Sequence, residues 1–294
     1  MILAEYLAAQ QTIVDEAIDR WVPPETEAPE TIHRAMRYSL FAGGKRIRPL
    51  LCITAAGAVS DAVEGIENAA CTLELIHTYS LIHDDLPALD NDELRRGRPT
   101  CHKVFGEAMA ILAGDALLTL AFEVLSRLPG VPETRKVRLV MELATAAGTA
   151  GGMIGGQVHD LEGEGKPPDA SLLESIHRAK TGALLRASLR MGGIYAGADE
   201  EQLAALSCFG EHAGLCFQIV DDLLDVEQSS EALGKTAGKD VQQHKITFPS
   251  VYGIEESHRM AERQRRLAHG AVVNLGDRAA HLRDIADLIA RRTA

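Results

Sequence analysis

Apolar residues repeat with helical spacing along almost the whole 294-residue chain, and this pattern limits the fold more than any other feature. Short segments rich in Gly, Pro or Asp interrupt it near residues 23–29, 43–44, 87–99, 129–132, 163–168, 192–199 and 229–245. A strand-like alternation is hard to find anywhere. Because only 4% of residues are aromatic, the composition also favours helices over sheets. The sequence therefore predicts one all-α domain over residues 1–294.

The charge balance and the cysteines narrow the class of protein. Lys and Arg number 30 against 42 Asp and Glu, so the net charge of −12 opposes a general nucleic-acid or anionic-membrane surface. The five cysteines are odd in number and form no CxxC motif, which argues against a disulfide framework and against a zinc site. We therefore expect a reducing, cytoplasmic location.

Neither the N-terminal segment nor the longest apolar stretch predicts a membrane anchor. Residues 1–20 contain Glu5 and Asp15 and lack a basic leader, so they indicate a surface helix and not a signal peptide. The apolar stretch 108–125 contains Asp115 and Glu123, which are costly in lipid. We expect no stable membrane insertion and no nucleic-acid partner.

Two predicted helices carry an apolar face that turns polar and acidic at its end. The first face passes through Val63, Ile66, Ala70, Leu73, His77, Ser80 and Asp84. The second passes through Leu203, Leu206, Gly210, Gly214, Gln218, Asp221 and Asp225. Buried carboxylates are expensive unless cations occupy the site, so the pattern predicts a polar cavity inside a helical bundle.

The two acidic strings suit a hard cation. Asp221 and Asp225 share one helix face at a separation of roughly 6 Å along the axis. In the string 84–90, Pro87 disfavours a regular helix, so we expect the chain to turn and bring Asp90 back. Carboxylates without Cys or His neighbours are typical of Mg²⁺ sites. The alternative for either string is a solvated acidic helix end.

Basic segments supply the other half of a diphosphate site. The segment GGKRIRP (43–49) predicts a basic turn that opens an apolar helix, where backbone N–H groups and cationic side chains converge on one anion. Arg95, Arg96 and Arg98 follow the first acidic string. Their alternative role is to form salt bridges with Asp92 and Glu93.

These segments together resemble the trans-prenyl diphosphate synthases. The resemblance covers residues 28–250 in the family's order. It rests on GGKRIRP (43–49), DDLPALDND (84–92), RRGRPT (95–100), HRAKTGALL (177–185), FQIVDDLLD (217–225) and LGKTAGKD (233–240). It implies an all-α helical bundle around a deep central cavity, a homodimer, and head-to-tail condensation of isopentenyl diphosphate with dimethylallyl or geranyl diphosphate.

The resemblance also implies a role for each matching residue. The implied metal ligands are Asp84, Asp85, Asp90, Asp221 and Asp225, which would hold three Mg²⁺ ions, with Mn²⁺ as the alternative ion. Isopentenyl diphosphate would bind to Lys45, Arg48, His77 and Arg96. The allylic diphosphate and its carbocation would meet Arg95, Lys180, Thr181, Gln218, Lys235 and Lys245. The released diphosphate would accept the final proton, so no protein base is required.

Tyr79 is the residue expected to set product length. It lies five positions before Asp84, about 7.5 Å along the helix axis. With the two extra residues between Asp85 and Asp90 relative to a plain DDxxD, the arrangement resembles that of bacterial farnesyl diphosphate synthases, and we expect a C15 product. The alternatives are a geranyl or geranylgeranyl diphosphate synthase, a class I terpene cyclase, a non-catalytic regulatory subunit of a heteromeric prenyl synthase and a helical scaffold protein.

Overall fold

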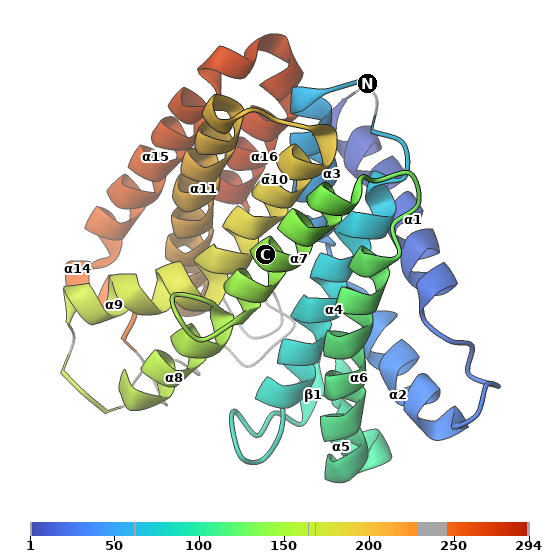
Figure 1. Ribbon diagram of the computed structural model, residues 1–294. Coiled ribbons are helices and arrows are strands. Elements are labelled where there is room, and N and C mark those ends of the chain that lie inside the picture. The colour runs from blue at the N-terminus through green and yellow to red at the C-terminus, as the bar shows by residue number, and fades with distance from the viewer. Residues whose placement is uncertain (1, 62, 164, 168, 228–245, 293–294) are drawn as a thin grey trace. The chain divides into compact units, whose positions relative to one another are not determined.

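The computed structural model describes residues 2–61, 63–163, 165–167, 169–227 and 246–292, and these are predominantly helical (Figure 1). Within them, the strands are limited to a two-residue antiparallel pair, β1 (Leu94–Arg95) and β2 (Arg98–Pro99). The predicted all-α class is therefore confirmed. The chain divides into two compact units, Met1–Ile53 with Glu64–Val140, and Thr54–Val63 with Met141–Ala294.

The first unit is organised around α4. Its helices are α1 (Leu3–Trp21), α2 (Glu30–Leu40), α4 (Ile66–Asp84), α5 (Cys101–Phe105) and α6 (Glu107–Ser126), together with the first parts of α3 (Ile47–Val59) and α7 (Glu133–Ala147). α4 packs against α6 and α1, and α2 also packs against α6. α4 therefore lies at the core of this unit.

The apolar face predicted for α4 is confirmed from Ile66 onward. Ile66, Ala70 and Leu73 are buried, whereas His77 and Asp84 further along the helix are only half-buried. Val63 precedes the helix, which begins at Ile66 after the left-handed Gly65. The face thus changes from core to polar surroundings along one helix.

The second unit is organised around the long helix α11. Its elements are α8 (Met153–Gly163), α9 (Ala170–His177), the π-helix η1 (Arg178–Gly182), α10 (Ala183–Ala196), α11 (Glu200–Glu227), α14 (Phe248–Tyr252), α15 (Ile254–Ala271), the 3₁₀ segment η2 (Val273–Ala279) and α16 (Ala280–Arg291), together with the last parts of α3 and α7. α11 packs against α10, α15 and α16. The predicted face of α11 is confirmed, since Leu203, Leu206 and Gly210 are buried.

α6 and α11 are long and apolar enough to cross a membrane by length and composition alone. Each buries a face within its own unit, and Leu117 and Leu125 of α6 and Leu206 and Phe209 of α11 are fully or almost fully buried. This burial is what a core helix of a folded unit also shows, so the two helices are weak evidence for membrane insertion.

Close packing of α10 on α11 depends on Gly210. Gly210→Ala should lower the free energy of unfolding by about 1–3 kcal/mol, because the added Cβ would lie 2.9 Å from Arg186 Cα and Leu189 Cδ1. Gly57→Ala in α3 is the control, since no heavy atom lies within 4 Å of its added Cβ. That exchange should raise stability by up to about 1 kcal/mol through helix propensity. Urea denaturation followed by circular dichroism measures both, and equal effects would contradict the packing argument.

Candidate active site

The basic turn 43–48 adopts a backbone that few residues tolerate. Gly43, Gly44 and Arg46 have φ angles of 91°, 130° and 49°. An added Cβ on Gly44 would lie 2.5 Å from Nη1 of Arg96, so only glycine lets that guanidinium lie against the turn. Arg96 also donates a hydrogen bond to the carbonyl of Gly43. The turn and the β1–β2 hairpin therefore meet at this point.

Positive charge gathers around His77 of α4. Burial lowers the pKa of His77 well below its ordinary value, and the charges of Arg48, Arg96, Arg95 and Arg46 lower it further. Burial also lowers the pKa of Arg48 to about 10; Glu74 opposes this and Arg96 adds to it. The buried Nε of Arg48 has no hydrogen-bond partner among the described residues. An anion is the ligand that this cluster would stabilise.

The predicted isopentenyl diphosphate ligands all belong to the first unit. Burial lowers the pKa of each of Arg48, His77 and Arg96, and the charge of Arg96 further lowers the pKa of both Arg48 and His77. Lys45 is exposed at the tip of the same turn. The structure therefore brings Arg48, His77 and Arg96 together, with Lys45 on the adjoining turn.

The first acidic string folds back as predicted. α4 ends at Asp84, and the N–H of Asp90 donates to the carbonyl of Asp84 at 2.8 Å. The N–H of Asp92 likewise donates to the carbonyl of Asp85 at 3.2 Å. The backbones of Asp84 and Asp90 are thus adjacent, so one hard cation could draw on both carboxylates.

Asp85 is buried and is engaged by Arg95. Its two carboxylate oxygens accept hydrogen bonds from Nε of Arg95 at 2.7 and 3.0 Å, and Nη2 lies 2.6 Å from Oδ1. Burial raises the pKa of Asp85, and the bonds from Arg95 only partly offset this. In this conformation Asp85 fixes the guanidinium of Arg95, a residue expected to bind the allylic diphosphate. The assignment of Asp85 to a metal ion stays a prediction.

The second acidic string places its three carboxylates in different surroundings. Asp221 forms an ion pair with Arg292 at 2.6 Å, and Asp222 accepts the N–H of Phe248 at 2.9 Å. Asp225 is buried, and its Oδ2 has no hydrogen-bond partner among the described residues. An unpartnered buried carboxylate oxygen costs free energy unless a cation approaches it.

The carboxylates of both strings fit a divalent cation. No three His, Cys, Asp or Glu side chains of the described part of the chain gather at metal-binding distances. Each string would therefore provide only part of a coordination shell. Mg²⁺ commonly keeps open positions for waters and substrate phosphates, so the donor set and the unpartnered Oδ2 of Asp225 are compatible with it.

Lys180 and Thr181 lie on the π-helix η1, which was not predicted from the sequence. An added Cβ on Gly156 of α8 would lie 2.1 Å from the backbone N of Lys180, so this glycine permits the close approach of the two helices. Nζ of Lys180 pairs with Oδ2 of Asp160 at 2.5 Å, and Thr181 is half-buried. Single π turns are rare and often occur at functional sites.

Gln218 is positioned by a buried histidine. Its Oε1 lies 2.9 Å from Nδ1 of His177, and the His177 ring stacks on Phe248 at 5.1 Å. Burial lowers the pKa of His177, although the bond with Gln218 opposes the shift. The predicted ligands Lys235 and Lys245 lie outside the described residues.

Tyr79 is buried on α4. Its hydroxyl has no hydrogen-bond partner among the described residues, and its ring meets His83 edge-on at 5.7 Å. Burial, with the nearby charge of Asp84, raises the pKa of Tyr79 to about 12. The phenol therefore presents a neutral group within the first unit.

Four residues that form ion pairs with residues in or next to the site were not identified from the sequence: Asp15, Glu74, Asp160 and Arg292. Glu74 had a detectable signal, since it is a lone charge within the apolar run 69–76 and such a residue requires a buried partner. The other three lie far in sequence from the residues they contact. No local pattern marks them.

Comparison with known proteins decides the family. The sequence profile of the polyprenyl synthetases matches residues 29–281. The chain belongs to the polyprenyl synthetase family. It is therefore a prenyltransferase that elongates prenyl chains, and the family's substrates are isopentenyl and allylic diphosphates. The family uses a divalent metal for diphosphate binding.

Individual relatives differ in their named products. The chain is 48% identical to the chloroplastic heterodimeric geranylgeranyl pyrophosphate synthase large subunit 1 of Arabidopsis thaliana, over 98% of this chain and 78% of that protein. It is 49% identical to the farnesyl diphosphate synthase of Geobacillus stearothermophilus, over 85% and 84%. Among solved structures, the geranylgeranyl pyrophosphate synthetase of Pyrococcus horikoshii aligns with a TM-score of 0.90 at 31% identity, covering 99% of this chain and 98% of that one.

His77 should remain neutral in the folded protein below its ordinary pKa of 6.5. The unfolded chain then binds a proton that the folded one does not, so folding stability should fall as the pH drops below 6.5. His77→Gln should remove a slope of up to about 1.4 kcal/mol per pH unit from the unfolding free energy in that range. Urea denaturation over a pH series measures the slope. A histidine NMR resonance that His77→Gln removes and that titrates at the ordinary pKa would contradict this prediction.

Proposed function

We propose that this chain condenses isopentenyl diphosphate head-to-tail with dimethylallyl and then geranyl diphosphate to give (2E,6E)-farnesyl diphosphate. The observation that carries the proposal is the presence of two kinds of anion-binding chemistry in one chain. A cluster of arginines surrounds His77, whereas the strings 84–90 and 221–225 offer carboxylates. In a condensation of two diphosphate substrates, one diphosphate leaves and the other is retained. Carboxylates that hold cations and a cluster of arginines can therefore each bind one of them.

The carboxylate strings serve the diphosphate that leaves. Divalent cations, which we propose to be three Mg²⁺ ions with Mn²⁺ as the alternative, supply positive charge where the departing diphosphate becomes more anionic. Their protein ligands are Asp84, Asp90, Asp221 and Asp225, with Asp85 contributing through water. Arg95, fixed by Asp85, and Lys180 hold the diphosphate oxygens, and Lys235 and Lys245 complete this set. Thr181 and Gln218 line the carbocation region.

The arginine cluster serves the diphosphate that is retained. Lys45, Arg48 and Arg96 bind isopentenyl diphosphate without metal, and neutral His77 donates a ring N–H to it. The C–O bond of the allylic diphosphate breaks, and the double bond of isopentenyl diphosphate forms the new C–C bond with the allylic carbon. The released diphosphate accepts the proton lost from the new cation. No protein group has to act as the base.

A C15 product is proposed because a buried tyrosine lies five residues, about 1.4 helical turns, before Asp84. Tyr79 fills space on α4, and a bulky ring at this position would stop the growing chain. Geranylgeranyl diphosphate is the second candidate product, favoured by the names of the Arabidopsis relatives. A non-catalytic regulatory subunit is less well supported, because the chain keeps both acidic strings.

We also propose that the active form is a homodimer. Ile111 and Leu112 of α6 and Val137 of α7 are apolar side chains with exposed fractions of 45%, 51% and 57%. Exposed apolar side chains, where they gather on a surface, are typical of protein contact sites. A second copy of the chain is the partner that a closed symmetric assembly would provide.

Product analysis tests the role of Tyr79. The purified protein, given Mg²⁺, isopentenyl diphosphate and dimethylallyl diphosphate, should form a C15 product, and Tyr79→Ala should form longer ones because the blocking ring is gone. Chromatography of the dephosphorylated products measures chain length. Tyr195→Ala, which removes a buried tyrosine of α10, should leave product length unchanged. A C20 product from the unaltered protein would refute the C15 proposal and keep the condensation chemistry.

Neighbouring aspartates on α11 should separate metal binding from folding. Asp221→Asn and Asp225→Asn should each lower kcat by about 100-fold or more and weaken the thermal stabilisation by Mg²⁺ with diphosphate, because each removes a proposed cation ligand. Asp222→Asn is the control. Its carboxylate accepts the N–H of Phe248 and lies 3.6 Å from His177, so the exchange should lower the unfolding midpoint while Mg²⁺ still stabilises the protein.

Chelation completes this test. EDTA should abolish product formation by the unaltered protein, and Mg²⁺ should restore it. Equal Mg²⁺ responses in Asp222→Asn and Asp225→Asn would count against the ligand assignment. No product under any metal condition, with activity appearing only when another polypeptide is added, would favour the regulatory-subunit alternative.

A further inference from the structure

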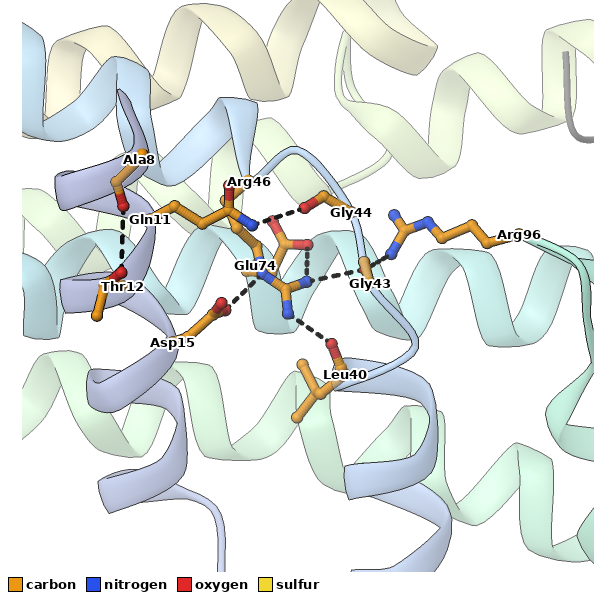
Figure 2. A network of polar contacts seen from close by, with 10 residues as sticks. All are labelled: Ala8, Gln11, Thr12, Asp15, Leu40, Gly43, Gly44, Arg46, Glu74 and Arg96. Carbon is orange, nitrogen blue, oxygen red and sulfur yellow. Dashed lines mark hydrogen bonds and ion pairs between the residues drawn. The ribbon is translucent and has the colours of Figure 1, made fainter. Parts of the chain in front are cut away.

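Helix α1 contacts the basic turn directly. Nε2 of Gln11 donates to the carbonyl of Gly44 at 3.2 Å, and Oδ1 of Asp15 accepts from Nε of Arg46 at 2.8 Å (Figure 2). Gln11 and Asp15 lie one helical turn apart, so one face of α1 makes both contacts. Both residues precede the range 29–281 that matches the family profile. The turn is thus fixed in part by residues outside that range.

Arg46 has its guanidinium fully engaged within the protein. Only 3% of the residue is exposed. Nη1 donates to Glu74 at 2.9 Å, Nη2 donates to the carbonyl of Leu40 at 2.7 Å, and Nε donates to Asp15 (Figure 2). Each of its three nitrogens therefore has an acceptor, and no face of the group is left to hold a substrate anion. Arg46 anchors the turn and is not itself a ligand.

The anchored backbone is strained, which is why the anchor matters. Arg46 has φ 49°, a left-handed conformation that non-glycine residues adopt only where their surroundings impose it. Lys45 and Arg48 lie immediately before and two residues after it. Relaxation of Arg46 to an ordinary backbone conformation would therefore redirect both of these cationic side chains.

We propose that Gln11 and Asp15 of α1 are positioning residues for isopentenyl diphosphate, because they hold the turn 43–48 in the conformation that presents Lys45 and Arg48. This inference rests on the proposed function of that turn. Neither residue contacts the substrate. Their removal should weaken binding of isopentenyl diphosphate and leave the allylic diphosphate unaffected.

The sign of the effect separates positioning from simple electrostatics. Asp15→Asn removes a negative charge beside a basic turn, so electrostatics alone would strengthen anion binding and lower the KM for isopentenyl diphosphate. Loss of the anchor predicts the opposite, a higher KM. Asp19 provides a matched control, since it lies one turn further along α1 and forms an ion pair with Arg37. Asp19→Asn removes the same charge from the same helix without touching the turn.

The experiment measures KM for each substrate and kcat in four proteins: the unaltered chain, Asp15→Asn, Gln11→Leu and Asp19→Asn. Asp15→Asn and Gln11→Leu should each raise the KM for isopentenyl diphosphate by about fivefold or more, with kcat and the allylic KM within about twofold of the unaltered values. Asp19→Asn should match the unaltered protein. Thermal unfolding run alongside shows whether any variant has lost its fold.

Direct binding keeps this test independent of the proposed reaction. Calorimetric titration of the same four proteins with inorganic diphosphate, in EDTA, reports the basic cluster without turnover. If the unaltered protein forms no prenyl product, the proposed function fails, and weaker diphosphate binding by Asp15→Asn and Gln11→Leu still supports the positioning role. Unchanged or tighter binding in both variants, or an equal change in Asp19→Asn, would overturn it.

Discussion

The ion pair between Arg46 and Glu74 is the interaction on which the first unit depends. Glu74 stands within the apolar run of α4, only 2% exposed, and a carboxylate there is tolerable only with a bonded cation. Arg46 supplies that cation at 2.9 Å and in doing so brings the turn 43–48 to the middle of α4. Burial alone would lower the pKa of Arg46, but Glu74 and Asp15 more than offset this, and the pKa is raised. Arg46 therefore keeps its positive charge beside Glu74.

A second buried carboxylate further along the chain, next to the end of α4, is also paired with an arginine. At the helix end, buried Asp85 is matched by Arg95 from β1, which fixes the hairpin that also carries Arg96. Between these two ion pairs lies His77, whose pKa is lowered by burial and further by the positive charges of neighbouring arginines. The first unit thus carries two satisfied ion pairs with an unbalanced positive region between them. An anion such as a diphosphate would supply the missing negative charge.

The features that depend on residues close together in the sequence could be predicted from it. Pro87 indicates why the helix ends near Asp84 and why Asp90 returns to it, because proline limits the backbone within its own neighbourhood. The faces of α4 and α11 followed from a repeat that any helix must show. The pairing of Asp85 with Arg95, the π turn at Lys180 and the contacts of α1 did not follow, because each depends on which side chains distant elements bring together. Product length could not be predicted from the sequence alone for the same reason, since it depends on the space around Tyr79 and not only on the type of residue.

In this chain, the hydrogen bonding of buried polar atoms, considered together with the local charge, distinguishes residues that support the fold from residues of the proposed site. Arg46 and Glu74 are engaged by protein groups, and their role is structural. Nε of Arg48, Oδ2 of Asp225 and the hydroxyl of Tyr79 are buried without hydrogen-bond partners among the described residues, and all three belong to the residues expected to meet substrate or metal. His102, His177 and Arg292 also have such an atom and are not expected ligands, so the criterion alone is not sufficient. The criterion indicates a binding site more strongly where the unpartnered atom lies in a region of unbalanced charge. There, one ligand would both form the missing hydrogen bond and balance the charge.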